Sequence, residues 1–270
     1  MPELPEVETV VRSLRPQLIG RTILVFEPIW PKVIEAVLLD DFTAAVEGQK
    51  IRDVTRRGKF ILLHLDSVHL AVHLRMTGTL FITRKPVTDF QHITAVFHIS
   101  AGEKLFFRDT RKFGRIYLYR NLEVLDRKLG IEPLGEEFTA EWLQENLRIR
   151  KRQMKALLLD QTFLAGLGNI YADEVLWRAK IHPLKLSNTV SSTKTKELHE
   201  AIGTILTDAI AANGTTIRDF TFQDEQTGGF NNELQVFQKE DSVCPRCSTT
   251  IRKIRAVGRG THICPRCQRQ

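Results

Sequence analysis

Residues 243–270 read VCPRCSTTIRKIRAVGRGTHICPRCQRQ and carry the strongest single signal in the sequence. All four cysteines of the chain lie here in two Cys-Pro-Arg-Cys pairs, Cys244 with Cys247 and Cys264 with Cys267, and sixteen residues separate the pairs. This is the spacing of a zinc ribbon, in which two turns joined by a β-hairpin bring four thiolates around one ion. We therefore predict one structural Zn²⁺ per chain, in a closed site rather than a catalytic one.

A disulfide framework is the alternative explanation for these cysteines. Disulfides persist mainly in secreted proteins, but the N-terminus, MPELPEVETV, is acidic and lacks the apolar stretch of a secretory signal. We therefore expect reduced thiols and a cytoplasmic protein. Because a module this short cannot build a sufficient core, we also expect it to need its metal in order to fold.

The charge of the chain is concentrated in the same region. The formal net charge is +7, and residues 239–270 hold eight basic and two acidic side chains. Such an uneven distribution indicates a surface that binds a polyanion, although a solvated basic tail is the plainer alternative. The basic residues between the cysteine pairs, which suit phosphate contact, are Arg252, Lys253, Arg255 and Arg259.

Further basic clusters occur upstream, at Arg56, Arg57 and Lys59, at Arg108, Arg111 and Lys112, and in the acid-free run 148–155, which includes Arg150 and Lys155. The segment 166–171, GLGNIY, is typical of a glycine-rich turn that enters a helix. Backbone N–H groups and Asn169 could hold a phosphate there. Taken alone, this last signal is weak.

The rest of the chain indicates a globular protein of mixed architecture. It has 270 residues, 42% of them hydrophobic, and it contains no apolar run of about 18 residues that could cross a membrane. Residues 5–15 predict a helix that Pro16 and Gly20 close. Short β-rich runs follow, as in a sandwich. They are 22–26, 60–65, 69–74, 93–99, 104–107 and 115–119.

The second half of the sequence has a helical rather than a β-rich pattern. Residues 130–138, with two glycines and a proline, predict a linker. An apolar stripe at helical spacing between residues 198 and 210 predicts a helix that stops near Asn213 and Gly214. The polar, glycine-containing stretch 215–235 predicts a mobile loop.

Several of these motifs occur together and in order. They are MPELPEVET at the start, RGK at 57–59, HLRMTG at 73–78, DTRKFG at 109–114, GLGNIYADE at 166–174 and the terminal ribbon. Together they closely resemble the bacterial formamidopyrimidine-DNA glycosylases along essentially the whole chain. Some of the motifs are loose individually, but their combination is highly specific.

The resemblance implies an α+β fold in three parts. Residues 1–130 would form an N-terminal catalytic β-sandwich with flanking helices, and residues 131–237 a helical DNA-binding domain of the helix–two-turn–helix type. A loop at 215–231 would close over the lesion. Residues 238–270 would form the zinc-ribbon β-hairpin, and DNA would lie in the cleft between the domains.

The resemblance also implies the activity. The protein would act in base-excision repair as a monomer at the nucleoid, excising oxidised purines (8-oxoguanine and formamidopyrimidines) opposite cytosine in duplex DNA. It would then cleave the abasic strand by β,δ-elimination. Pro2 would be the Schiff-base nucleophile, Glu3 the proton donor to the deoxyribose ring, and Lys59 a basic group near the sugar and phosphates.

Other positions take DNA-binding roles from the same resemblance. Met76, Arg111 and Phe113 match residues that fill the gap left by the flipped nucleotide, with Arg111 facing the opposite cytosine. The alternative is that Met76 and Phe113 are core residues, which is the usual place for such side chains. Contacts with the DNA backbone are expected from His92, Arg150, Lys155, Asn169 and Arg259, and Arg259 would also assist the final elimination.

The proposed nucleophile has a plain chemical basis. An α-amino group has a reference pKa near 8, so an appreciable fraction is neutral at pH 7. The secondary amine of a terminal proline can form an iminium with C1′ of the sugar, and that iminium draws electrons for elimination of the phosphates. This chemistry requires removal of Met1, because otherwise the nitrogen of Pro2 is an amide.

The sequence departs from the family pattern at two places. Phe90 stands where a phosphate-contacting histidine is usual, although His92 is retained, and residues 236–239 read VFQK where VYGR or VYGK is common. Two other functions stay open. One is an enzyme resembling endonuclease VIII, which favours oxidised pyrimidines, and the other is a non-catalytic zinc-ribbon protein that binds DNA. The sequence does not rank 8-oxoguanine against ring-opened purines.

Overall fold

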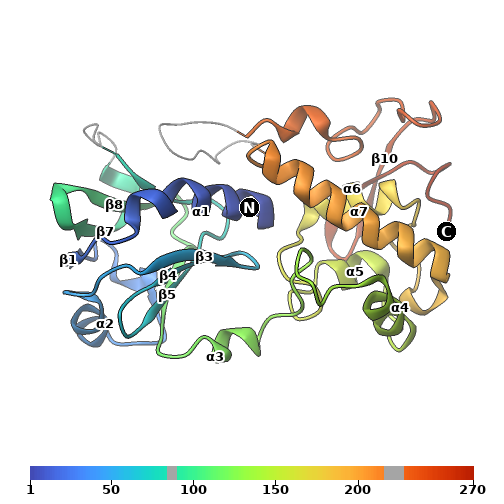
Figure 1. Cartoon of the computed structure of the whole chain (residues 1–270). Helices are drawn as coiled ribbons and strands as arrows, with labels where there is room; N and C mark the ends of the chain where they lie inside the picture. The colour runs from blue at the N-terminus through green and yellow to red at the C-terminus, as the bar shows by residue number, and fades with distance from the viewer. Residues whose placement is uncertain (84–89, 216–227) are drawn as a thin grey trace. The chain divides into compact units, whose positions relative to one another are not determined.

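The computed structural model describes residues 1–83, 90–215 and 228–270 (Figure 1). The chain divides into two compact units. The first comprises Met1–Arg127 with Ala212–Gly229, and the second comprises Lys128–Ala211 with Phe230–Gln270. Among the described residues, none of the helices combines the length and apolarity needed to cross a bilayer.

The first unit contains two β-sheets around one core. The four-stranded sheet has the order β1 (Ile23–Glu27), β7 (Ile93–Ile99), β8 (Lys104–Asp109) and β6 (Gly78–Ile82). The five-stranded sheet has the order β2 (Ile34–Glu35), β9 (Arg115–Tyr119), β5 (His69–His73), β4 (Phe60–His64) and β3 (Asp53–Arg57). Buried side chains from both sheets and from the first helix form a single hydrophobic cluster, so the predicted sandwich is confirmed.

The predicted strands correspond closely to the observed ones. The runs 93–99 and 115–119 match β7 and β9 to the residue, and the other four end within two residues of an observed strand. Three strands, β2, β3 and β6, were not predicted. Short helices lie between and after the strands. They are η1 (Pro31–Val33), α2 (Leu39–Val46), η2 (Phe90–His92), η3 (Ser100–Gly102) and α3 (Glu123–Asp126).

Helix α1 (Leu4–Leu18) is longer than the sequence predicted. Pro16 lies inside it, so the expectation that this proline closes the helix is wrong. Leu14 and Leu18 are both buried in the core, and their burial holds the last turn although Pro16 cannot donate a backbone hydrogen bond. Gly20, with a φ of +84°, provides the turn beyond it.

The second unit is mainly helical. Its helices are α4 (Ala140–Arg148), α5 (Met154–Leu158), α6 (Asn169–Arg178), η4 (Ser187–Thr189), α7 (Ser192–Ala211) and η5 (Phe230–Glu233). Strands β10 (Arg252–Ala256) and β11 (Arg259–Ile263) form the antiparallel C-terminal hairpin. The apolar stripe predicted between residues 198 and 210 is the buried face of α7. Together, the sheets, the helical region and the hairpin confirm the predicted α+β class (Figure 1).

Two predicted loops are more ordered than expected. In the stretch 130–138, Gly130 donates a backbone hydrogen bond to the carbonyl of Gln161, and a Cβ there would come within 2.3 Å of the Phe163 backbone. Of the predicted mobile loop 215–235, residues 216–227 lie outside the described residues. Its last part forms η5 with Phe230 buried, so that part of the prediction is wrong.

Candidate nucleic-acid interface and zinc site

The start of α1 places Pro2 and Glu3 in a buried position. Glu3 is 2% exposed and is the residue that precedes the first helical turn. Its backbone N–H donates to Oε2 of Glu6 at 2.8 Å, and its side chain accepts from the Glu6 backbone in return. This reciprocal capping box fixes the direction in which the chain enters the helix. Pro2, also buried, therefore lies just before the positive end of a helix dipole.

Glu6 also connects this turn to a distant part of the sequence. Its Oε1 accepts a hydrogen bond from the backbone N–H of Thr215 at 2.7 Å. Gly214 contacts Glu6 so closely that a Cβ would lie 2.8 Å from Oε1, and Thr215 pairs with Gly229 in an isolated bridge. Both ends of the segment 216–227 are thus held beside the N-terminal residues, within the first unit.

Lys59 and His73 lie at the end of β4 and β5 nearest the turn at Gly58. Both side chains are buried, and Nδ1 of His73 accepts from the backbone N–H of Arg75 at 3.0 Å. Burial, together with the nearby charges of Arg75 and Lys59, lowers the pKa of His73 to about 3. The neutral imidazole of His73 and the cationic side chains of Lys59 and Arg75 together form a suitable environment for binding an anionic group. His73 was quoted in the sequence only as part of a motif, and no role was predicted for it.

We expect His73 to make the protein acid-sensitive. The folded imidazole stays neutral down to about pH 3, whereas the unfolded one takes up a proton near pH 6.5, so the free energy of unfolding falls as the pH drops below 6.5. Between pH 7 and pH 5 the loss should be about 2 kcal/mol. Denaturant titrations at both pH values should show a smaller loss for His73→Gln than for the wild type. An equal loss in the two proteins would contradict this account.

Met76, Arg111 and Phe113 form an exposed cluster on the first unit. The side chains of Met76 and Phe113 are 44% and 46% exposed, so the alternative that they are core residues is wrong. The guanidinium carbon of Arg111 lies 4.8 Å from the ring centroid of Phe113, and Nη1 of Arg111 lies 3.2 Å from the sulfur of Met76. Large apolar side chains grouped in this way on a surface indicate an interaction site.

The buried carboxylate of Asp109 holds this cluster in place. It accepts from the backbone N–H groups of Arg111 at 3.1 Å and Gly114 at 2.6 Å, and it also hydrogen-bonds the hydroxyl of Thr77. A Cβ at Gly114 would lie 2.5 Å from the Phe107 ring, so only glycine fits there. No role was predicted for Asp109, although the residue opens the DTRKFG motif.

His92 is half-buried at the end of η2. Phe90, which replaces a usual histidine, is 58% exposed in the same short helix. The preceding segment 84–89, which includes Asp89, lies outside the described residues. The structure therefore places Phe90 as an exposed aromatic side chain rather than a core residue.

In the second unit, Lys155 is fully buried. Its Nζ donates to Oδ1 of Asp173 at 2.6 Å and to Oγ1 of Thr261 at 2.7 Å, while Oδ2 of Asp173 accepts from the backbone of His262 at 2.9 Å. This network joins α5, α6 and β11. A direct contact between Lys155 and a DNA phosphate would require the ammonium group to be uncovered, so that role stays a prediction.

Asn169 and Arg259 lie on adjoining elements of this unit. Asn169 is the first residue of α6, which confirms the predicted glycine-rich turn into a helix, and its amide donates to the carbonyl of Gly260 at 3.1 Å. Arg259 is exposed at the start of β11. Arg150 is half-buried, with its guanidinium 5.2 Å from the ring centroid of Phe163.

The four cysteines form a metal site. Their sulfur atoms all lie within 4.8 Å of one another. The individual Sγ–Sγ distances of 3.4 Å, 3.5 Å and 4.0 Å bracket the value of about 3.8 Å that Zn–S bonds of 2.3 Å give in a tetrahedron. They are far longer than a disulfide bond of about 2.05 Å, so the disulfide alternative is wrong. Burial raises the pKa of the Cys264 and Cys267 thiols, and a bound cation would be needed to ionise all four together.

The ribbon is attached to the helical part of the second unit. Cys244 and Cys264 share a hydrophobic cluster with Trp177 of α6, and the guanidinium of Arg246 stacks 4.1 Å from the Trp177 ring centroid. The buried carboxylate of Glu174, also on α6, accepts three backbone hydrogen bonds from residues 235–237 just before the ribbon. A zinc ion in the four-cysteine site would therefore organise a module that is continuous with the helices.

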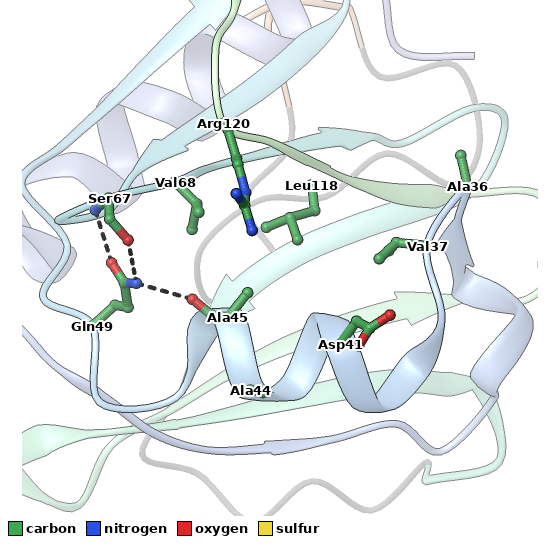
Figure 2. A pocket seen from close by; sticks show the side chains of 10 residues that line it. All are labelled: Ala36, Val37, Asp41, Ala44, Ala45, Gln49, Ser67, Val68, Leu118 and Arg120. Carbon is green, nitrogen blue, oxygen red and sulfur yellow. Dashed lines mark hydrogen bonds between the residues drawn. The ribbon is translucent and has the colours of Figure 1, made fainter.

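A separate pocket of about 920 Å³ lies in the first unit between α2 and the inner face of the five-stranded sheet (Figure 2). At one side, Gln49 hydrogen-bonds the hydroxyl of Ser67 and the carbonyl of Ala45, as the dashed lines show. Arg120 points into the pocket beside Val68. None of the predicted site residues lines it.

Comparison with known proteins covers the whole chain. Models of the formamidopyrimidine-DNA glycosylase N-terminal domain, of the H2TH domain of the same enzymes and of a zinc finger found in FPG and IleRS match residues 1–116, 129–221 and 241–270. Formamidopyrimidine-DNA glycosylases of Pelotomaculum thermopropionicum and Chloroflexus aurantiacus are 45% and 42% identical, over 100% and 99% of this chain and 99% and 98% of theirs.

Comparison with solved structures points to the same family as the sequence relatives. A Lactococcus lactis FPG mutant in complex with DNA containing Fapy-dG superposes with a TM-score of 0.92 at 38% identity, over 100% of both chains. The Lactococcus lactis enzyme with DNA containing an abasic site gives the same score and identity over 99% of this chain and 100% of the other. A non-catalytic zinc-ribbon protein is therefore the wrong alternative, and the cysteines match a zinc finger. This chain is a zinc-containing DNA glycosylase and belongs to the formamidopyrimidine-DNA glycosylase family.

Proposed function

We propose that this DNA-repair glycosylase excises oxidised purines, 8-oxoguanine and formamidopyrimidines, from duplex DNA and then cleaves the abasic strand. The observation that carries the proposal is the placing of Pro2 and Glu3 together at the buried start of α1, beside Glu6. The substrate class is supported by the Lactococcus lactis relatives, which were solved with DNA containing Fapy-dG or an abasic site.

In the proposed reaction, the nitrogen of Pro2 attacks C1′ of the damaged nucleotide after Met1 has been removed. The N–C1′ bond forms while the glycosidic bond breaks, and the departing base takes up a proton in exchange for the one that the Pro2 nitrogen releases. Glu3 donates a proton to the ring oxygen, which opens the sugar and gives an iminium between Pro2 and C1′. Loss of a C2′ proton then expels the 3′ phosphate, and a second elimination expels the 5′ phosphate. Water finally releases Pro2.

The position of Pro2 supports this role. The helix dipole at the start of α1 disfavours a positive charge there, which favours the neutral amine that can act as a nucleophile. Lys59 and the neutral His73 would hold a phosphate next to the sugar, and Arg259 would bind another and assist the elimination. His92, Arg150, Lys155 and Asn169 would contribute to binding of the DNA backbone.

The exposed cluster on the first unit would replace the flipped nucleotide. Extruding a base costs a few kcal/mol of stacking and pairing. Met76 and Phe113 would fill the gap as apolar wedges, and Arg111 would hydrogen-bond the opposite cytosine. The loop 215–231 would close over the base, and its first residue, Thr215, bonds Glu6 and pairs with Gly229.

We also propose the working organisation of the protein. Residues 1–130 would be the catalytic domain, 131–237 the helix–two-turn–helix domain and 238–270 the zinc finger, in a monomer that contacts DNA with both compact units. Because its substrate is chromosomal DNA, the enzyme would act at the nucleoid.

The preference for cytosine opposite the lesion gives a test of Arg111. A good bidentate base contact discriminates by about 1–3 kcal/mol, so we expect excision to be about ten-fold or more faster opposite cytosine than opposite adenine. Arg111→Ala should remove most of that preference while leaving the melting temperature nearly unchanged. Single-turnover rates on the two duplexes measure the effect. Lys112→Ala, an exposed cation one residue away, serves as the control and should keep the preference.

The direct test of the proposed function is the identity of the released base. Duplexes carrying 8-oxoguanine, a formamidopyrimidine or an oxidised pyrimidine should be incubated with enzyme and the free bases identified by mass spectrometry. We expect release of both purine lesions and little release of the pyrimidine. The opposite order would support an enzyme resembling endonuclease VIII.

A further inference from the structure

Two half-buried histidines face each other on the side of the five-stranded sheet opposite the hydrophobic core. His64 ends β4 and His69 begins β5, and the strand register pairs them directly. Their Nδ1 atoms are 3.1 Å apart, and the two ring planes meet at 78°. Neither residue belongs to the motifs that carry the glycosylase resemblance, and both lie at the opposite end of the β4–β5 pair from Lys59 and His73.

The protonation of this pair is constrained by its geometry. Two ring nitrogens at this distance have room for one proton between them, so one imidazole must present a lone pair. Burial, and for His64 also the charge of its neighbour His69, lowers the pKa of these histidines. Both rings are therefore neutral at neutral pH, which is the form in which imidazole binds metal ions.

A neighbouring hydroxyl group orients one of the rings. Oγ1 of Thr55, on β3, lies 2.7 Å from Nε2 of His64. When Nε2–H donates to this hydroxyl, Nδ1 of His64 keeps its lone pair on the side of His69. Metal-binding histidines in proteins are commonly fixed by such a hydrogen bond from the second ring nitrogen.

The strand register places one further residue on each side of the histidine pair. Asp53 of β3 pairs with His64, and Tyr119 of β9 pairs with His69, so the four side chains share one face of the sheet. The carboxylate of Asp53 is held by Arg15 at 2.7 Å, which keeps the pKa of Asp53 below its ordinary value. The histidine pair thus lies between an ionised carboxylate and a phenol, and all four residues are half-buried.

We propose that His64 and His69 form a binding site for a divalent transition-metal ion such as Zn²⁺, separate from the four-cysteine site. Nitrogen ligands at 2.0–2.1 Å lie about 3.3 Å apart on a tetrahedral ion and about 2.9 Å apart at neighbouring octahedral positions. The observed 3.1 Å falls between these values. The ion takes the place of the proton between the two Nδ1 atoms, that proton moves through solvent to Nε2 of His69, and water completes the coordination of the ion. By joining β4 to β5, it stabilises the hairpin.

The test uses full-length protein whose four cysteines already hold zinc, so that added zinc reports on further sites. Calorimetric titration with Zn²⁺ at pH 7.5 should show one additional equivalent. His64→Asn and His69→Asn should each weaken it by more than about ten-fold, and Thr55→Val by about ten-fold, since it removes the orienting hydroxyl. His98→Asn is the matched control, because His98 lies on the four-stranded sheet, where its Nε2 is 2.9 Å from Oε2 of Glu27, and it should change nothing.

A second measurement needs no substitution. In NMR spectra of the zinc-loaded wild type, added Zn²⁺ should shift the ring signals of two of the eight histidines, and these should be the two that disappear in His64→Asn and His69→Asn. The proposal is overturned if no further zinc binds, or if the shifted signals belong to other histidines.

Discussion

Cys244→Ser is expected to abolish DNA binding and to release the zinc, while the first unit stays folded. Structural zinc contributes about 10–16 kcal/mol of apparent binding free energy in small ribbons, far more than the hairpin can replace by its own packing. Without the ion, Arg259 loses its position at the start of β11. The buried network of Lys155, Asp173 and Thr261 loses one of its three elements. Metal analysis, a DNA-binding titration and a melting curve measure the three effects.

The matched control is Arg259→Ala, which should retain one zinc per chain. It removes one cation near the phosphates, so binding should weaken modestly and the slope of log affinity against log salt should fall by about one. If Cys244→Ser lost its zinc yet bound DNA as tightly as the wild type, the ribbon would have no part in DNA binding.

Glu3→Gln is expected to bind lesion-containing DNA normally and to lose base excision by a factor of about 10² to 10⁴, the range over which a positioned general acid acts. The amide keeps the shape of the side chain and can still accept the backbone hydrogen bond of the capping box, so α1 should form as before. Single-turnover excision and equilibrium binding should be measured on the same 8-oxoguanine duplex.

Glu8→Gln provides the control on the same helix. Glu8 pairs with Arg12 and Arg56 and lies one turn further along, so its replacement should leave excision within about two-fold. Equal losses in Glu3→Gln and Glu8→Gln would indicate a general disturbance of α1 rather than a proton donor.

Features that depend on local sequence were largely predictable. The spacing of Cys244, Cys247, Cys264 and Cys267 predicted a site whose geometry the structure reproduces, because four ligands on two short turns leave few other arrangements. Strand β7 was predicted to the residue because its alternating apolar side chains match the period of a sheet.

Features that depend on tertiary contacts were not predictable. Pro16 reads as a helix terminator, and only the burial of Leu18 explains why the helix continues. From the sequence, Lys155 looks like an exposed member of the basic run 148–155. In the structure it is fully buried and donates hydrogen bonds to Asp173 and Thr261, which are distant in the sequence. The pairing of His64 with His69 required the strand register.

The exposure of Met76 and Phe113 shows the same limit. Methionine and phenylalanine side chains usually lie in the core. Only the resemblance to the glycosylase family predicted that these two would be exposed. Asp109 organises the loop that carries Arg111, which leaves the neighbouring Phe113 on the surface.

The central claim, that the nitrogen of Pro2 is the nucleophile, is tested most directly by borohydride trapping on 8-oxoguanine DNA followed by mass spectrometry of the cross-linked peptide. We expect a reduced adduct on the nitrogen of Pro2, in protein that lacks Met1, and strongly weakened trapping in Pro2→Gly. An adduct on a lysine such as Lys59, or full activity in protein whose intact mass retains Met1, would contradict the account.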